Sequence, residues 1–195
     1  MKSNRNPLPA ALVPLLGVLP VVASAHTFGA RGAGFLAGGL HPFIGVDHLL
    51  AMVAVGLWAA QLGGRALWLV PATFVASLVV GALLAYGGVA LPAVETAVML
   101  SLLVIGSLVA TAAHLPTGAG MALVAAFALF HGHAHGSELP QAANAWAYLA
   151  GFTGATALLH ASGVAAARRL RGAMGWLVRG AGAVVAGAGV WLLAG

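Results

Sequence analysis

The three acidic residues of this 195-residue chain all lie where an ionised side chain is costly. Asp47, Glu95 and Glu138 each fall within, or at the edge of, a long apolar stretch. A charge at the centre of a membrane-spanning helix costs about 2.5–3.5 kcal/mol on insertion scales, and such residues commonly mark an ion or substrate path. The three carboxylates are therefore functional candidates.

Histidines accompany two of these carboxylates. His41 and His48 are seven residues apart, so they share one helical face, with Asp47 beside it, if the helix continues through Pro42. This pattern predicts a polar cluster on the first apolar stretch.

A second histidine pattern precedes Glu138. His131 and His135 are four residues apart, and Glu138 is seven residues beyond His131, which stacks the three along one stripe of a helix. His133 is rotated about 200° from His131, so it is the least expected ligand of this group. Two glycines within this segment would permit either close helix packing or local unwinding.

These side chains form a ligand set suited to a divalent transition metal. Imidazole binds nickel, zinc, copper and iron, and carboxylate oxygen adds negative charge. A carboxylate can instead orient a histidine through a hydrogen bond. The chain has no cysteine, so thiolate sites and disulfides are excluded. We expect a metal site built from imidazole and carboxylate groups.

Three further residues are weaker candidates. Glu95 lies in the first turn of its helix, where the helix dipole alone favours a carboxylate, so it is either a dipole partner or a gate. His160 is either an exit-side residue or a hydrogen-bonded core residue. His26 would combine a free α-amine with its imidazole if a signal peptide ends at Ala25; the alternative is a polar residue tolerated at the cleavage site.

The elements that position these residues are membrane-spanning helices. Hydrophobic residues make up 62% of the chain and charged residues only 6%, whereas a soluble domain carries about 25% charged residues. Polar side chains are too few to cover a soluble fold, so the solvent is lipid. Lys2 is the single lysine, which excludes a Gly-Lys-Ser/Thr phosphate loop and hence a recognisable ATPase. The basic residues flank apolar segments, which argues against nucleic acid as a partner.

Residues 1–25 are predicted to be a cleaved signal peptide. Lys2 and Arg5 precede an apolar stretch, and residues 23–25 are Ala-Ser-Ala, the small-x-small pattern read by signal peptidase. Cleavage would leave His26 as the mature N-terminus, outside the cytoplasm. The alternative is an uncleaved first transmembrane helix. Residues 26–195 then form a single domain.

The mature chain offers six apolar stretches of the roughly 20 residues that a bilayer requires. They are residues 43–62, 67–87, 92–112, 118–136, 143–166 and 173–194. The expected fold is an all-α, six-helix transmembrane bundle. The positive-inside rule places Arg65 and the arginines of segment 168–171 in the cytoplasm. Both termini are then periplasmic in a bacterial inner membrane, and the acidic and histidine residues gather near the outer face.

Two long motifs resemble one family. Residues 41–48, HPFIGVDH, resemble the H-P-x-x-G-x-D-H signature of the HupE/UreJ family, and residues 130–138, FHGHAHGSE, are similar to its second motif, F-H-G-x-A-H-G-x-E. Residues 91–95 resemble its third-helix segment. The five residues between His41 and Asp47 argue against the larger nickel/cobalt transporter family, which has four.

The resemblance implies a six-helix permease that carries Ni²⁺ or Co²⁺ into the cytoplasm, with a link to hydrogenase or urease maturation. It assigns metal handling to His41, Asp47, His48, His131, His135 and Glu138. No permanently bound cofactor and no enzymatic activity are expected. Two alternatives stay open: a membrane metalloenzyme of the histidine-rich di-iron type, and a non-transporting metal sensor or accessory subunit.

Overall fold

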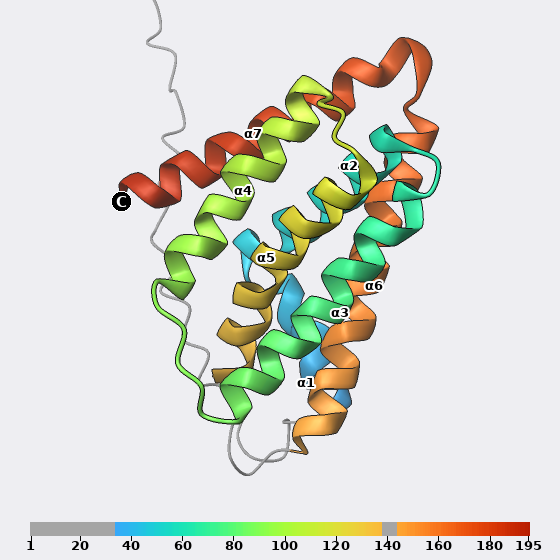
Figure 1. Ribbon diagram of the computed structural model, residues 1–195. Helices are drawn as coiled ribbons and strands as arrows, with labels where there is room; N and C mark the ends of the chain where they lie inside the picture. Colours follow the sequence, from blue (N-terminus) through green and yellow to red (C-terminus); the bar gives the residue numbers. More distant parts are fainter. Residues whose placement is uncertain (1–33, 138–143) are drawn as a thin grey trace, which may run out of the picture.

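The computed structural model describes residues 34–137 and 144–195, and every regular element in these residues is helical. The predicted signal peptide, His26 and Glu138 lie outside the described residues. The helices (Figure 1) are α1 (Phe35–Leu40), the 3₁₀ helix η1 (His41–Phe43), α2 (Val46–Leu62), α3 (Ala66–Tyr86), α4 (Val94–Thr111), α5 (Thr117–Ser137), α6 (Ala145–Arg169), the 3₁₀ helix η2 (Gly172–Met174) and α7 (Gly175–Ala194).

Five of these helices, α3 to α7, are long and apolar enough to cross a membrane. A sixth span results if the α1–η1 segment and α2 are counted as one bent pair. The ends of α3 to α7 agree with the predicted spans to within three residues. The expectation of an all-helical, multi-span membrane protein is confirmed.

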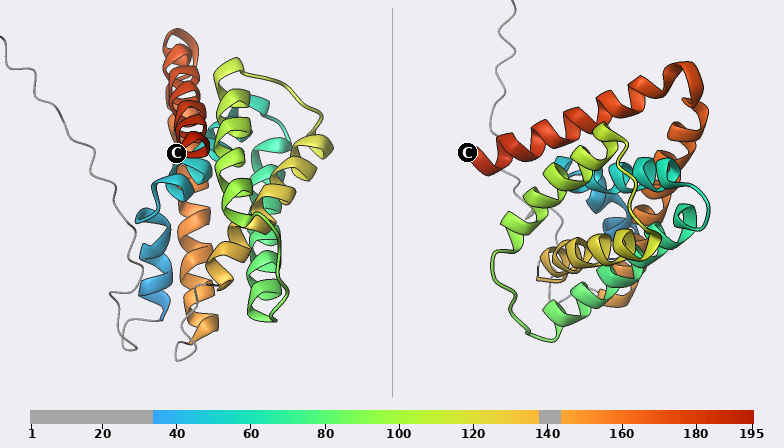
Figure 2. Two further views of the ribbon diagram at one scale, coloured as in Figure 1. Left: turned by 90° about the vertical axis from the view of Figure 1, so that its left-hand side faces the viewer. Right: turned by 45° about the horizontal axis from the view of Figure 1, so that its top comes forward.

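The first span differs from the expected continuous helix over residues 43–62. The α1–η1 segment and α2 meet at an angle of 83°, which the left view of Figure 2 shows where the blue helix turns into the cyan one. Pro42 has no N–H to donate to a helical hydrogen bond, and Gly45 is extended, with φ −83° and ψ 108°. The helical run therefore stops after η1 and starts again at Val46.

The helices alternate in direction, so the bundle has two ends (Figure 1). At one end α2, α4 and α6 finish and α3, α5 and α7 begin; we call it the arginine end. It holds all arginines of the described residues: Arg65, Arg168, Arg169, Arg171 and Arg179. At the opposite end, the histidine end, α3 and α5 finish and α4 and α6 begin. The basic residues are thus segregated from the acidic ones.

Close backbone contacts hold α3 against α5. A Cβ atom at Gly132 would collide with the carbonyl oxygen of Leu78, and one at Gly81 would collide with that of Leu129. Small residues allow this approach, which replaces hydrophobic driving force in lipid. Helix α5 is continuous to Ser137, so its glycines serve helix packing and the alternative of local unwinding is wrong.

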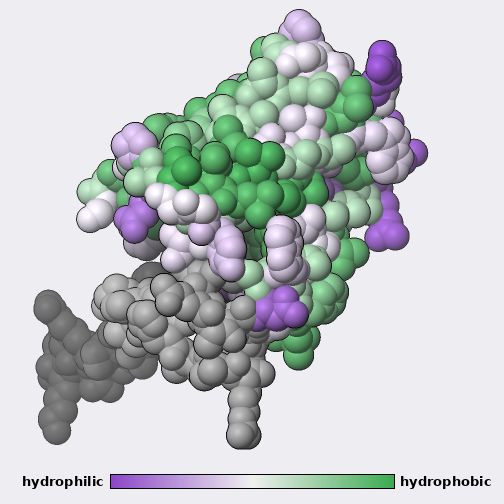
Figure 3. All heavy atoms as spheres, turned by 60° about the horizontal axis from the view of Figure 1, so that its bottom comes forward, coloured by the Kyte–Doolittle hydropathy of each residue, from purple (hydrophilic) through white to green (hydrophobic). Residues whose placement is uncertain are grey.

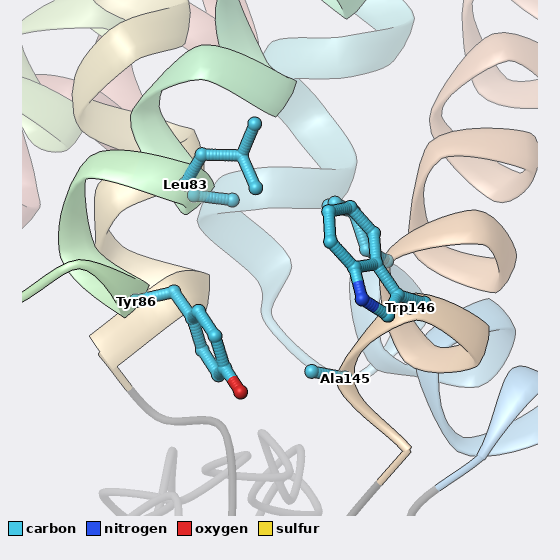
Figure 4. A pocket seen from close by; sticks show the side chains of 6 residues that line it. Leu83, Tyr86, Ala145 and Trp146 are labelled. Carbon is cyan, nitrogen blue, oxygen red and sulfur yellow. The ribbon is translucent and has the colours of Figure 1, made fainter.

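Exposed aromatic side chains mark both ends of the bundle. Tyr86 and Trp146 lie at the histidine end, where Figure 4 shows their rings around a small apolar cavity between α3 and α6. Trp68 and Trp176 are exposed at the arginine end. Rings of this kind sit at membrane–water interfaces. Figure 3, which looks toward the histidine end, shows hydrophobic side chains over much of the surface and hydrophilic ones in small patches.

Candidate metal site

Four imidazole rings from three segments converge inside the histidine end. The ring centroids of His41 and His135 are 4.6 Å apart, those of His48 and His135 are 4.2 Å apart, and those of His48 and His131 are 4.8 Å apart. We call these four residues the histidine cluster. His131 is 0% exposed and His135 4% exposed, so the inner half of the cluster is shielded from solvent.

Asp47 fixes the tautomer of His48. Its Oδ1 atom lies 2.9 Å from Nδ1 of His48 and also accepts the backbone N–H of His48 at 2.8 Å. A carboxylate only accepts hydrogen bonds when it is ionised, so Nδ1 of His48 carries the proton. The lone pair of His48 is then on Nε2, which is buried and has no hydrogen-bond partner. This is the arrangement in which a carboxylate orients a metal-binding histidine.

Ser101 fixes the tautomer of His131 in the same way. The hydroxyl of Ser101 donates to the carbonyl oxygen of Val98 at 2.6 Å and lies 2.9 Å from Nε2 of His131. Because the only hydroxyl proton is used, Ser101 accepts a hydrogen bond from Nε2–H of His131. The lone pair of His131 is then on Nδ1, which is buried without a partner.

The cluster therefore presents two unused lone pairs on neighbouring rings, at Nε2 of His48 and Nδ1 of His131. A buried acceptor without a partner costs about 1–3 kcal/mol, and a bound cation would satisfy both atoms. Within the described residues, no group of three or more His, Asp or Glu side chains stands close enough to hold one ion. The rings are adjacent and two of them offer a nitrogen lone pair, but they are not a preformed cage.

Gly45 leaves the space that the Asp47–His48 pair occupies. A Cβ atom at Gly45 would lie 3.0 Å from Oδ1 of Asp47 and 3.3 Å from Nδ1 of His48. Both distances are tighter than ordinary van der Waals contact, so a side chain here would displace the pair. The glycine within the first motif thus has a steric role beside the site.

Aromatic side chains wall the cluster. On α6, the Phe152 ring centroid is 4.1 Å from that of His135, and Tyr148 is 5.8 Å from His41. On α3, the ring of Phe74 is 5.7 Å from His131 and 4.9 Å from His160. Sequence analysis missed these residues and Ser101. An aromatic residue in an apolar helix carries no distinguishing signal, whereas Ser101 is visible as a hydroxyl within the α4 span.

Of the two predicted helical faces, the one on α5 agrees with the structure and the one on the first span does not. His131 and His135 both contact His48, as their spacing on a continuous helix predicts. The predicted shared helical face of His41 and His48 is wrong, because the helix breaks between them. Instead, each of the two rings contacts the ring of His135. His133 points elsewhere, and its Nε2–H donates to the carbonyl oxygen of Val89 at 2.7 Å.

The weaker candidates lie outside the cluster. Glu95 is exposed in the first turn of α4, and it makes no hydrogen bond or ion pair with an imidazole of the described residues. His160 is 2% exposed, and neither of its ring nitrogens has a hydrogen-bond partner. The ring of Phe74 contacts both His160 and His131 of the cluster. His26 and Glu138 fall outside the described residues.

The fold and the site together define a multi-pass membrane protein with a buried imidazole cluster. The chain belongs to the HupE/UreJ family, because the family model described as HupE / UreJ protein matches residues 14–192. It is also 49% identical over 178 residues to Protein HupE of Rhizobium leguminosarum bv. viciae, covering 91% of this chain and 93% of that protein. No solved structure matches the chain.

Membership of this family reduces the number of functions that the sequence left open. It is a family of transporters, not of enzymes, and it is implicated in nickel and cobalt transport and associated with accessory roles for hydrogenase and urease. The di-iron enzyme alternative is thereby removed. Membership of the family does not by itself assign roles to the individual residues of the cluster.

Proposed function

We propose that this protein is a permease that carries Ni²⁺ or Co²⁺ into the cytoplasm through the histidine cluster. The observation that supports this most is the pair of buried lone pairs on His48 and His131, each set by a hydrogen bond on the opposite side of its ring. Asp47 supplies negative charge beside the ion. Glu138, which follows α5 in the sequence, is the further carboxylate ligand in this proposal.

The broken first span supports the same site. Irregular backbone within a membrane is tolerated where it is buried in protein or lines a cavity, and discontinuous helices commonly form the ion sites of transporters. Here the break at residues 44–45 leaves His41 before it and the Asp47–His48 pair after it. A break at this position lets two ligands approach the α5 histidines from different directions.

The direction of transport follows from charge. The positive-inside rule assigns the arginine end to the cytoplasm, which puts the histidine cluster toward the periplasm of a bacterial inner membrane, with both termini periplasmic. The membrane potential then drives uptake. One charge crossing 100 mV gains about 2.3 kcal/mol, so a divalent ion gains about 4.6 kcal/mol. N-terminal analysis of the membrane-purified protein should give His26 if residues 1–25 are a cleaved signal peptide.

His160 is the next imidazole toward the arginine end. It lies on α6 one helix turn beyond Thr156 and is separated from His131 by the ring of Phe74, which contacts both. In this proposal the ion passes from His131 to His160, and passage requires the Phe74 ring to move. The unpartnered nitrogens of His160 are suited to receive it.

Uptake into proteoliposomes under a fixed membrane potential tests the proposal. Wild-type protein should accumulate radioactive nickel or cobalt, and His48→Ala and His131→Ala should each abolish uptake. The matched control is His114→Ala, because His114 is exposed at the arginine end and away from the cluster. If His48→Ala and His131→Ala transport as well as the control, the cluster is not the ion site. Wild-type protein that binds metal but never transports it would identify a sensor or accessory subunit.

A further inference from the structure

A cavity with polar and apolar walls lies at the arginine end, away from the histidine cluster. It has a volume of about 630 Å³ and lies between the ends of α2, α4 and α6 and the start of α7. Its lining includes Gln61, Leu170, Arg171, Trp176, Val178 and Arg179. Ligand pockets commonly measure about 300–1,000 Å³, so this cavity is large enough for a substantial organic group.

Two arginines are fixed on the walls of this cavity. Nη2 of Arg171 donates to the carbonyl oxygen of Ala60 at 3.1 Å, and Nε of Arg179 donates to that of Ala110 at 2.8 Å. Both carbonyls lie in the last turn of their helices, so these bonds cap α2 and α4. Capping uses one N–H of each guanidinium, which has five. The two positive charges are therefore held in place with further donors to offer.

No side-chain carboxylate of the described residues neutralises these arginines. Asp47 and Glu95 both lie at the histidine end, and Glu138 directly follows Ser137 in the sequence. Five arginines gather at the arginine end without an acidic partner there. The start of α7 adds to the positive potential, because no side chain caps this helix N-terminus. Anions from outside the protein must balance this charge.

We propose that the cavity binds the phosphate headgroup of an anionic phospholipid, with Arg171 and Arg179 as its ligands. Arginine binds phosphate through parallel N–H···O hydrogen bonds, and basic pockets between transmembrane helices on the cytoplasmic side accept such headgroups. The exposed Trp176 at the rim marks the level of the membrane interface. The apolar walls at Leu170 and Val178 suit the glycerol and upper acyl chain, which inorganic phosphate lacks.

Lipid retention by the full-length protein tests this site without relying on transport. The protein is equilibrated in detergent with equal amounts of phosphatidylglycerol and phosphatidylcholine, and bound lipid is counted by native mass spectrometry. Wild type should retain phosphatidylglycerol preferentially. An arginine near the surface is worth roughly fivefold in anionic lipid binding, so Arg171→Gln with Arg179→Gln should lower that preference about thirtyfold. The matched control is Arg65→Gln with Arg169→Gln, which removes two exposed arginines from the same end.

The control double variant should keep the wild-type preference. Equal loss in both double variants would mean that only net charge matters, and the cavity would not be a site. Because capping is also lost, the Arg171→Lys, Arg179→Lys variant is compared. It keeps the charge but loses the parallel donors, so it should recover only part of the retention. Failure of this variant to exceed the glutamine variant would overturn the proposal. Displacement of phosphatidylglycerol by inorganic phosphate at equal concentration would assign the cavity to a soluble anion instead of lipid.

Discussion

The hydroxyl of Ser101 lies 2.9 Å from Nε2 of His131, and this contact determines which nitrogen of His131 can meet an ion. The hydroxyl of Ser101 donates its one proton to the carbonyl oxygen of Val98, so it must accept a hydrogen bond from His131. The pairing of Asp47 with His48 has the same consequence on the neighbouring ring. Ser101, on a helix that supplies no imidazole, thus sets the tautomer of His131. Asp47 sets that of His48, its neighbour on α2.

Removal of the Ser101 hydroxyl should weaken metal capture without unfolding the protein. Ser101→Ala frees His131 to adopt either tautomer, and loss of such an orienting partner costs about 10–100-fold in metal affinity. The apparent KM for nickel uptake should rise by that factor. Ser107→Ala is the control, because Ser107 lies on the same helix and its side chain makes no hydrogen bond to an imidazole of the described residues. An unchanged KM in Ser101→Ala would show that the tautomer of His131 does not limit binding.

His133 should behave differently from His131 and His135. Its ring is directed at the α3–α4 connection, where Nε2–H donates to Val89. His133→Ala should keep nickel uptake near the wild-type level at matched membrane abundance, while unfolding becomes easier by about 1 kcal/mol, the usual worth of one hydrogen bond. Thermal unfolding in detergent measures the second effect. Abolished uptake in His133→Ala with retained uptake in His131→Ala would contradict the site.

The membrane spans and the common helical face of His131 and His135 are the parts that sequence reasoning predicts well. Span length follows from bilayer thickness, and the spacing of His131 and His135 determines their common face once α5 is continuous. Both properties depend only on residues that are close together in the sequence. In the sequence, Pro42 indicates that the first span could break. The 83° bend also depends on how α1 and α2 pack along α6. There Gly38 lies against Tyr148 and Gly56 lies against the backbone of His160.

The residues that orient and enclose the histidine cluster come from distant parts of the sequence. Ser101 reaches His131 from 30 residues away, and Phe74 reaches both His131 and His160 from α3. A single sequence records that these residues exist, but the contacts arise from helix packing between α3, α4 and α5. Sequence reasoning therefore found the imidazoles and Asp47, but it missed Ser101, which orients His131, and the aromatic rings that enclose the cluster.

Nickel uptake should fall as the outer solution becomes acidic. An imidazole binds metal only when it is neutral, and its ordinary pKa is about 6.5. Protons therefore compete with the metal for the imidazole nitrogens as the pH falls. Proteoliposomes held at constant potential should take up clearly less nickel at about pH 5.5 than at about pH 7.5. Equal uptake at both values would argue against imidazole capture as the limiting step.

Gly45→Ala separates the steric role of this glycine from its backbone role. Gly45 has φ −83°, which alanine adopts without strain, so the substitution should leave the stability of the protein nearly unchanged. The new methyl group would lie 3.0 Å from Oδ1 of Asp47 and 3.3 Å from Nδ1 of His48. Relief of this contact requires the pair to shift by a few tenths of an ångström, which turns Nε2 of His48 relative to His131.

The expected result is a rise of roughly tenfold in the apparent KM for nickel, the lower bound for disturbing a residue that orients a metal ligand. The control is Gly39→Ala in α1, where the nearest atom to a new Cβ is 3.8 Å away, an ordinary contact. Uptake kinetics and thermal unfolding are measured on both variants at equal abundance. A normal KM in Gly45→Ala would show that the Asp47–His48 pair is free to move without loss. Gly39 lies in the same span but does not touch the Asp47–His48 pair. Equal destabilisation of both variants would therefore mean that the effect comes from the backbone of the first span and not from the site.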